Sequence, residues 1–263
     1  MTMQTIYPGL TYADAPAAIA WLERAFGCVP EQVYPGDPGK IAHAQLRVGR
    51  ELVLLGSAGP SLMGPRSSPA MLGGHGTISL YLHVTDIESA FARAQAAGSK
   101  IVRPLAGTDY DDSLIFTAED SEGYAWAFGT YAASPDTDLS PCLRFADAPR
   151  AIGWLKETFG FEEKMLVPDG SGGVAHCELA FGTGLIMCGS HRDDDQHCDS
   201  PVRAGGTAGT TYLYTADPDT LFARASDVAA DIARPIQDME YGSREFSIRD
   251  LEGNVFSFGT YRP

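Results

Sequence analysis

The sequence predicts an α+β protein built from four β-α-β-β-β modules. Three observations carry this prediction: the chain is duplicated, four strand-like segments end in Asp, and a helix-like segment follows each Asp. The chain has 263 residues, of which 44% are hydrophobic and 20% are charged, as is usual for a globular protein. This length fits two medium-sized domains.

Several short motifs occur twice in the same order, which indicates an internal duplication. Trp21 recurs as Trp154, and His43 recurs as His176. The longest repeated segments are ADAP at 13–16 and 146–149, and FGTY at 128–131 and 258–261.

The duplication predicts two homologous domains, at residues 1–131 and 139–263. The segment between them, 132–138, reads AASPDTD and is interpreted as a short polar linker.

Within each domain a weaker repeat divides the chain into two modules. Each module opens with a strand-like segment that ends in Asp, and Asp favours a helix start because its carboxylate accepts the free amides of the first turn. Apolar residues then follow at helical spacing, as at Ala18, Trp21 and Leu22. The strand-like openings are 7–14, 79–86, 140–147 and 210–217. Three β-patterned runs complete a module, at 30–35, 41–48 and 51–56 in the first one.

The charge and the cysteines limit the possible partners. The formal net charge is −15 with no basic stripe, so we expect no nucleic-acid partner and no polybasic membrane anchor. No apolar stretch is long enough to span a bilayer, and the N-terminus does not read as a signal peptide. Five cysteines without a C-x-x-C pair favour reduced thiols, and hence a cytoplasmic protein.

The Asp-ended openings, together with the Gly-x-x-x-x-Phe-Gly-Thr-Tyr segments that begin at Gly123 and Gly253, resemble the vicinal oxygen chelate superfamily. This superfamily includes glyoxalase I, extradiol dioxygenases, fosfomycin-resistance enzymes and bleomycin-binding proteins. The resemblance covers nearly the whole chain and implies two curved eight-stranded mixed sheets, each enclosing a cavity. Whether modules pair within or across the repeats stays open.

The resemblance also implies two metal-ligand positions in each module, one opening the first strand and one four residues after a Gly on the last strand. None of the eight residues there is His, Asp or Glu, the side chains that bind divalent metals well. We therefore expect no metal cofactor, with a divalent metal at an atypical site as the alternative. The residues are Tyr7, Ser79, Ser140 and Thr210 on the first strands, and Val53, Ala127, Ile186 and Ser257 on the last strands.

Five polar residues on the predicted strands are candidates for ligand binding. Strand alternation places His43 with Gln45, and His176 with Glu178, on one face of equivalent strands. His83 shares a face with the strand-opening residues before it, and a cavity holding both His43 and His83 could bind a metal or support acid–base chemistry. Alternatively, these side chains have no role in ligand binding and simply form hydrogen bonds on a half-buried sheet.

Three further candidates lie near the predicted cavity mouths. Tyr110 and Tyr241 precede equivalent strands, and aromatic hydroxyls suit ligand binding, although they equally suit turn packing. Arg244 follows Tyr241 but has no counterpart in the first repeat, so we expect the two cavity rims to differ in charge. The segment 191–198, HRDDDQHC, is interpreted as a solvated acidic loop.

The leading functional hypothesis is a metal-independent protein that binds a small organic molecule, similar to the bleomycin-resistance branch and suited to sequestering a drug or toxic metabolite. The acidic net charge would favour a cationic ligand. The alternative is a glyoxalase-like lyase or isomerase, or a dioxygenase, with ligands at His43, His83, His176 and Glu178. A third class is a structural protein with filled cavities. The expected assembly is a monomer or a homodimer.

Overall fold

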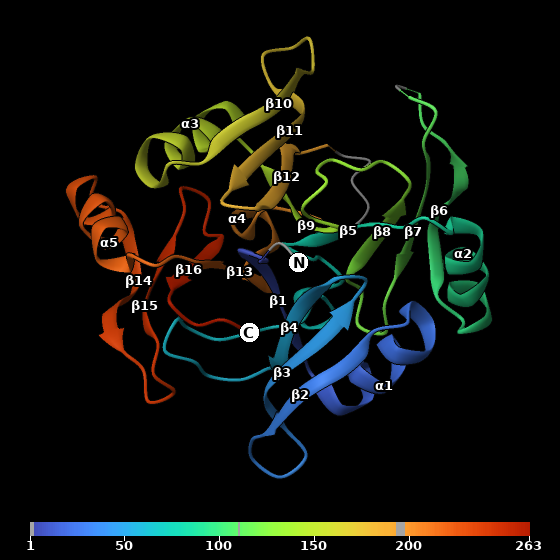
Figure 1. Cartoon of the computed structure of the whole chain (residues 1–263), viewed down its shortest axis with the longest axis horizontal. Coiled ribbons are helices and arrows are strands. Elements are labelled where there is room, and N and C mark those ends of the chain that lie inside the picture. Colours follow the sequence, from blue (N-terminus) through green and yellow to red (C-terminus); the bar gives the residue numbers. More distant parts are fainter. Residues whose placement is uncertain (1–2, 110, 193–197) are drawn as a thin grey trace.

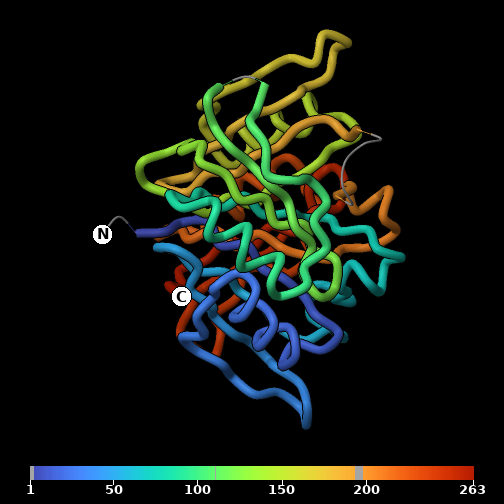
Figure 2. Tube along the Cα trace, turned by 90° about the vertical axis from the view of Figure 1, so that its right-hand side faces the viewer, coloured from blue at the N-terminus to red at the C-terminus, as the bar shows by residue number. Residues whose placement is uncertain are grey.

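The structure is a computed structural model that describes residues 3–109, 111–192 and 198–263. It confirms the predicted α+β fold: four βαβββ modules form two eight-stranded mixed sheets. Figure 1 shows the four modules around a common centre, with the longer helices at the periphery. Figure 2 shows two hairpins projecting at opposite ends of the molecule, β2–β3 and β10–β11.

The elements follow the predicted module order. The first module contains β1 (Ile6–Tyr12), α1 (Ala15–Phe26), β2 (Val29–Pro35), β3 (Ile41–Val48) and β4 (Glu51–Ser57). After the short helix η1 (Pro69–Leu72), the second contains β5 (Ser79–His83), α2 (Ile87–Ala96), β6 (Lys100–Gly107), β7 (Leu114–Glu119) and β8 (Ala125–Gly129). The third contains β9 (Leu139–Phe145), α3 (Ala148–Phe159), β10 (Glu162–Pro168), β11 (Val174–Phe181) and β12 (Gly184–Ser190). After α4 (Pro201–Ala204), the fourth contains β13 (Gly209–Tyr214), α5 (Pro218–Asp227), β14 (Asp231–Asp238), β15 (Arg244–Arg249) and β16 (Val255–Gly259).

The strands pair across the two sequence repeats, which answers the question that the sequence left open. The first sheet joins modules one and four through antiparallel β1 and β13, with Tyr7 opposite Tyr212. The second sheet joins modules two and three through antiparallel β5 and β9, with Tyr81 opposite Ser140. Each sheet therefore contains one module from each repeat.

The helices, in contrast, pack within the repeats. Figure 1 shows α1 beside α2, and α3 beside α5. Phe26 of α1 contacts Trp126 and Phe128 of β8, with ring centroids 5.2 and 5.1 Å apart. In the second repeat, Phe159 of α3 stacks on Phe258 of β16 at 4.7 Å. Each repeat thus buries its helices between its own two modules, while its strands complete sheets with the other repeat.

The predicted Asp caps are confirmed at all four long helices. The Asp14 carboxylate accepts a hydrogen bond from the Ala17 amide, and Asp86 accepts one from Ser89. Asp147 and Asp217 cap their helices in the same way. These local contacts explain why the helix starts can be recognised from the sequence.

Contacts with Glu51 of β4 fix the linker at 132–138 to the first sheet. Its carboxylate is buried and accepts hydrogen bonds from the Thr137 hydroxyl and the Asp138 amide, at 2.8 and 2.6 Å. The neighbouring Arg50 forms an ion pair with Asp138 at 2.6 Å. The segment 132–138 therefore connects β8 and β9 of the second sheet and is hydrogen-bonded to β4 of the first.

Candidate functional site

Strand alternation gives each sheet one face that packs against helices and one that does not. We call the second the inner face. On the first sheet its buried centre is Tyr7, Leu52 and Tyr212. On the second sheet it is Tyr81, Leu185 and Met187. The candidate sites are built on these two inner faces.

Six of the eight predicted metal positions lie on the inner faces, but two do not. The placement of Val53 and Ile186 is wrong, because both pack in the core against the helices. Counted from its Gly, the inward-facing residue is the third one in β4 and β12, whereas it is the fourth one in β8 and β16. Their neighbours Leu52 and Leu185 face inward instead.

The residues at these inner positions do not fit the divalent metal that the resemblance implies. They offer hydroxyl or alkyl groups, neither of which binds such an ion strongly near neutral pH. Among residues 3–109, 111–192 and 198–263, no cluster of three or more His, Cys, Asp or Glu could hold a metal. Most of the acidic segment 191–198 lies outside the described residues.

His43 and Gln45 share the inner face of the first sheet, as predicted. Gln45 is only 1% exposed, and its amide Nε2 donates to the Tyr261 hydroxyl oxygen at 2.6 Å. The His43 ring lies between Tyr34, at 6.0 Å, and Tyr261, at 6.3 Å, measured between centroids. The C-terminal Tyr261 therefore covers this polar pair.

Burial lowers the pKa of His43 below its usual value, and the positive charge of Arg66 lowers it further, while Glu245 opposes the shift. His43 is therefore neutral at neutral pH. A neutral imidazole can accept a hydrogen bond from a ligand or donate one to it. This chemistry is compatible with binding and with proton transfer.

A buried ion pair lies on β14 and β15 of the same inner face. Arg234 and Glu245 are 2.7 Å apart, and both are almost fully buried. Tyr241 borders them, with its ring 5.5 Å from that of Tyr261. Burial and the nearby Glu245 carboxylate raise the pKa of Tyr241 to about 12, so its hydroxyl stays protonated.

Arg244 and Tyr110 are the other two residues predicted to lie at the cavity rims. Arg244 lies on the helix side of β15, where its guanidinium pairs with Asp219 of α5 and with Asp238, at 2.7 and 3.1 Å. The expectation that Arg244 charges the cavity rim is therefore wrong, since alternation turns Glu245 inward in its place. Tyr110 lies outside the described residues.

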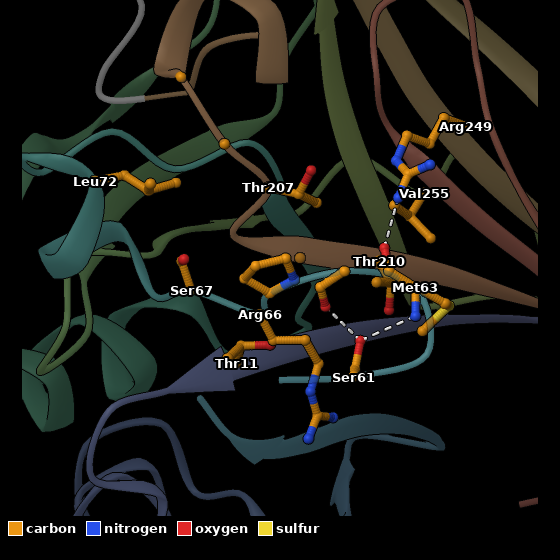
Figure 3. Close-up of a pocket in the computed structure, with 15 residues that line it drawn as sticks. Thr11, Ser61, Met63, Arg66, Ser67, Leu72, Thr207, Thr210, Arg249 and Val255 are labelled. Carbon is orange, nitrogen blue, oxygen red and sulfur yellow. Dashed lines mark hydrogen bonds between the residues drawn. The ribbon is translucent and has the colours of Figure 1, made fainter. Parts of the chain in front are cut away.

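A pocket of about 300 Å³ opens at one end of the first sheet's inner face (Figure 3). The strands supply one wall through Thr11, Thr210 and Val255. The segment between β4 and η1 covers it with Ser61, Met63 and Arg66, and Thr207 before β13 closes another side. Both repeats thus contribute to one pocket of apolar groups, hydroxyls and guanidinium groups.

The covering segment is held in place by specific contacts. Arg249 donates to the Met63 carbonyl oxygen at 2.6 Å (Figure 3). Backbone hydrogen bonds join Gly59 and Arg66 in both directions, at 3.1 and 2.8 Å. The Ser61 hydroxyl closes the tip by donating to the Gly64 carbonyl. The cover is therefore part of the folded structure.

The inner face of the second sheet carries an equivalent cluster with different chemistry. Glu178 is 2% exposed and stands where the first sheet has Gln45. Its carboxylate accepts from the Tyr131 hydroxyl at 2.9 Å and lies 3.2 Å from His176 Nε2. Tyr81 donates to the Tyr131 carbonyl at 2.7 Å, as Tyr212 does to Tyr261 at 3.0 Å.

His83 belongs to β5 of the second sheet, and its Nδ1 lies 3.2 Å from Asp138 Oδ1. His43 belongs to β3 of the first sheet. The expectation that these two histidines share one cavity is therefore wrong. The pairing across repeats separates them, and the sequence left that pairing open.

Sequence reasoning missed Arg66 and the role of the two tyrosines that end the FGTY motifs, Tyr131 and Tyr261. The tyrosines carried a signal, because they are duplicated with the residues they contact. Arg66 carried none, since it lies in a Gly/Pro/Ser-rich segment whose path over the sheet depends on tertiary contacts.

The fold is similar to that of solved glyoxalase and dioxygenase structures. Glyoxalase I from Zea mays matches with a TM-score of 0.74 at 15% identity, covering 97% of this chain and 92% of that one. A putative dioxygenase from Bacillus subtilis matches with a TM-score of 0.61 at 13% identity, covering 100% of this chain and 86% of that one. At these identities the similarity shows the fold alone. None of the described helices is long and apolar enough to cross a bilayer.

Sequence relatives match about half of the chain. Uncharacterized proteins of Mycobacterium bovis and Mycobacterium tuberculosis are each 35% identical over 123 residues, which is 46% of this chain and 80% and 71% of theirs, respectively. The profile of the Glyoxalase/Bleomycin resistance protein/Dioxygenase superfamily matches residues 5–128. Together with the duplicated βαβββ modules, these matches establish that the chain belongs to the Glyoxalase/Bleomycin resistance protein/Dioxygenase superfamily.

Proposed function

We propose that the chain binds a small organic molecule without a metal, in the pocket on the first sheet, and acts by sequestering it. The observation that carries this proposal is a covered pocket of about 300 Å³ on an inner face whose central residues are poor metal ligands. Pockets of this size with apolar walls and a few polar groups are typical of small-molecule sites.

The walls of the pocket suit an organic ligand with an apolar body. Met63, Leu72 and Val255 supply apolar surface, and the hydroxyls of Thr11 and Thr210 lie on neighbouring strands. Burial of the ligand would provide most of the affinity, and the hydroxyls would orient it. The cationic ligand stays a prediction for the second repeat, which is more acidic than the first.

The test uses an uncharged fluorescent probe, N-phenyl-1-naphthylamine, and a variant that fills the pocket. Ser67 lines the pocket, so Ser67→Trp should abolish saturable one-to-one binding. Ser121→Trp, in an exposed turn, is the matched control and should bind as the unmodified protein does. Equal binding by Ser67→Trp, or tight uptake of one Ni²⁺, Zn²⁺, Mn²⁺ or Fe²⁺ per repeat, would contradict the proposal.

An enzymatic function is the second candidate, because the neutral His43 lies 3.5 Å from the Gln45 amide nitrogen and close to Arg66 of this pocket. Native mass spectrometry of freshly purified protein would distinguish the two. A ligand recovered unchanged supports sequestration, whereas a product formed by the protein and lost in His43→Ala supports catalysis.

A further inference from the structure

Arg66 differs from the other arginines of the first sheet's inner face because its guanidinium has no acceptor among the residues that the structure describes. Its Nε is buried without a hydrogen-bond partner, and no side-chain hydrogen bond or ion pair of Arg66 is formed within the described chain. Arg234 pairs with Glu245, and Arg249 pairs with Asp231 and bonds to a backbone carbonyl. The Arg66 guanidinium is therefore available to bind a ligand.

The position of this guanidinium is fixed by the fold. The two backbone hydrogen bonds with Gly59 hold Arg66 at the edge of the pocket cover. Its Nη1 lies over β4, where a Cβ atom on Gly56 would be 3.4 Å away. Figure 3 shows its side chain leaving the cover on the side opposite Arg249.

Burying a charged group is unfavourable unless an opposite charge or hydrogen bonds compensate for it. Burial lowers the pKa of Arg66, and no carboxylate of residues 3–109, 111–192 or 198–263 offsets this shift. No Asp or Glu lines the pocket in the part of the chain that the structure describes, although the chain as a whole has 34 acidic residues. The cover and strands therefore form a positively charged pocket in an acidic protein.

We propose that the ligand of this pocket is an organic anion, with a carboxylate, sulfonate or phosphate group that Arg66 binds and an apolar body against Met63 and Val255. This inference rests on the proposed function and adds the charge class of the ligand. Arg66 supplies the charge-assisted hydrogen bonds, since a guanidinium presents two N–H groups in the geometry of an oxyanion. The Ser67 hydroxyl lies on the same cover and can complete the contact, whereas the Ser61 hydroxyl already donates to the Gly64 carbonyl.

The experiment compares two probes that differ mainly in one anionic group. 8-Anilinonaphthalene-1-sulfonate carries a sulfonate, and N-phenyl-1-naphthylamine lacks it. Both are titrated by fluorescence into the unmodified protein, Arg66→Met and Arg66→Lys. Arg24→Met is the matched control, because Arg24 is an exposed residue of α1 that bonds to the Ala20 carbonyl.

We expect Arg66→Met to weaken binding of the sulfonate probe by about tenfold or more, the usual loss when a hydrogen bond to a charged group is removed. Binding of the uncharged probe should change by less than about twofold, which also shows that the variant folds and keeps its pocket. Arg66→Lys should lie between the two proteins, and Arg24→Met should match the unmodified protein.

Equal affinity of the sulfonate probe for Arg66→Met and the unmodified protein would overturn the inference while leaving the binding function intact. Failure of both probes to bind the unmodified protein saturably, or binding that Ser67→Trp does not reduce, would overturn the proposed function and the inference with it. A loss of both probes in Arg66→Met would assign Arg66 to the support of the cover, and so would also refute its role in charge recognition.

Discussion

The buried ion pair between Arg234 and Glu245 allows a quantitative test of how the inner face of the first sheet is held together. In Glu245→Gln the guanidinium keeps its positive charge but loses the carboxylate 2.7 Å away. Arg234 is 8% exposed and its Nε has no partner in the part of the chain that the structure describes, so water can compensate for little of the loss. Breaking a buried pair in this way costs about 3–5 kcal/mol, and we expect the free energy of unfolding to fall by that amount.

Two controls separate this effect from a general sensitivity of the strand. Arg234→Met combined with Glu245→Leu removes both charges, and the unfolding free energy should lie within about 1–2 kcal/mol of that of the unmodified protein. Asp219→Asn breaks an exposed pair with Arg244, the preceding residue on the opposite face of β15, and should leave stability unchanged within error.

The assay is equilibrium unfolding in urea, followed by far-ultraviolet circular dichroism and by tryptophan fluorescence. Coincident transitions and an unchanged dependence on urea concentration are needed before the free energies are compared. A loss below about 1 kcal/mol in Glu245→Gln, or a double variant as unstable as the single one, would show that the pair is solvated and refute the reasoning.

Three further predictions concern stability. Burial raises the pKa of the Asp250 carboxyl to about 6, so its stabilising contribution is present at low pH and is lost as the pH rises from about 4 to about 6. Compared with Asp250→Asn, the unmodified protein should lose up to about 3 kcal/mol of unfolding free energy between pH 4 and pH 7, as measured by urea unfolding. Parallel pH profiles of the two proteins would contradict this prediction. Asp147→Ala should lower the unfolding free energy by about 1 kcal/mol through loss of the α3 cap, whereas Asp147→Asn should change it little, and equal losses in the two variants would argue against capping. Tyr261→Phe leaves the buried Gln45 amide without its acceptor and should cost about 1–3 kcal/mol by thermal or urea unfolding, a cost that a second substitution, Gln45→Leu, should partly remove if the contact is responsible.

Features that depend on neighbouring residues could be predicted from the sequence. The helix starts follow from Asp14, Asp86, Asp147 and Asp217, because each carboxylate bonds to an amide three residues away. The pairing of modules could not be predicted, since β1 and β5 open their modules with similar apolar strands. Either strand could form the antiparallel contact with β9 or β13, and the choice depends on contacts between distant segments.

The same distinction applies to the candidate site. Alternation along β3 placed His43 and Gln45 together correctly, because both lie within one regular strand. Arg244 was misplaced because it is the first residue of β15, where the face depends on how β15 pairs with β16. The position of Arg66 in the pocket could not be predicted, because its segment has no regular sequence pattern. Its place depends on how this segment crosses the sheet in the folded structure.

The duplication also explains why the two inner faces should differ in the ligands they accept. Gln45 donates its amide hydrogen to the Tyr261 oxygen, so the Tyr261 hydroxyl proton remains available to an acceptor on a ligand. In the second sheet the Tyr131 hydroxyl donates to Glu178, which uses its proton and leaves a carboxylate as the polar group of that face. One amide-for-carboxylate difference thus turns a donor site into an acceptor site on the same scaffold. An anion that binds Arg66 would meet the Glu178 carboxylate as a like charge on the other inner face, so we expect one anion to bind per chain despite the twofold repeat.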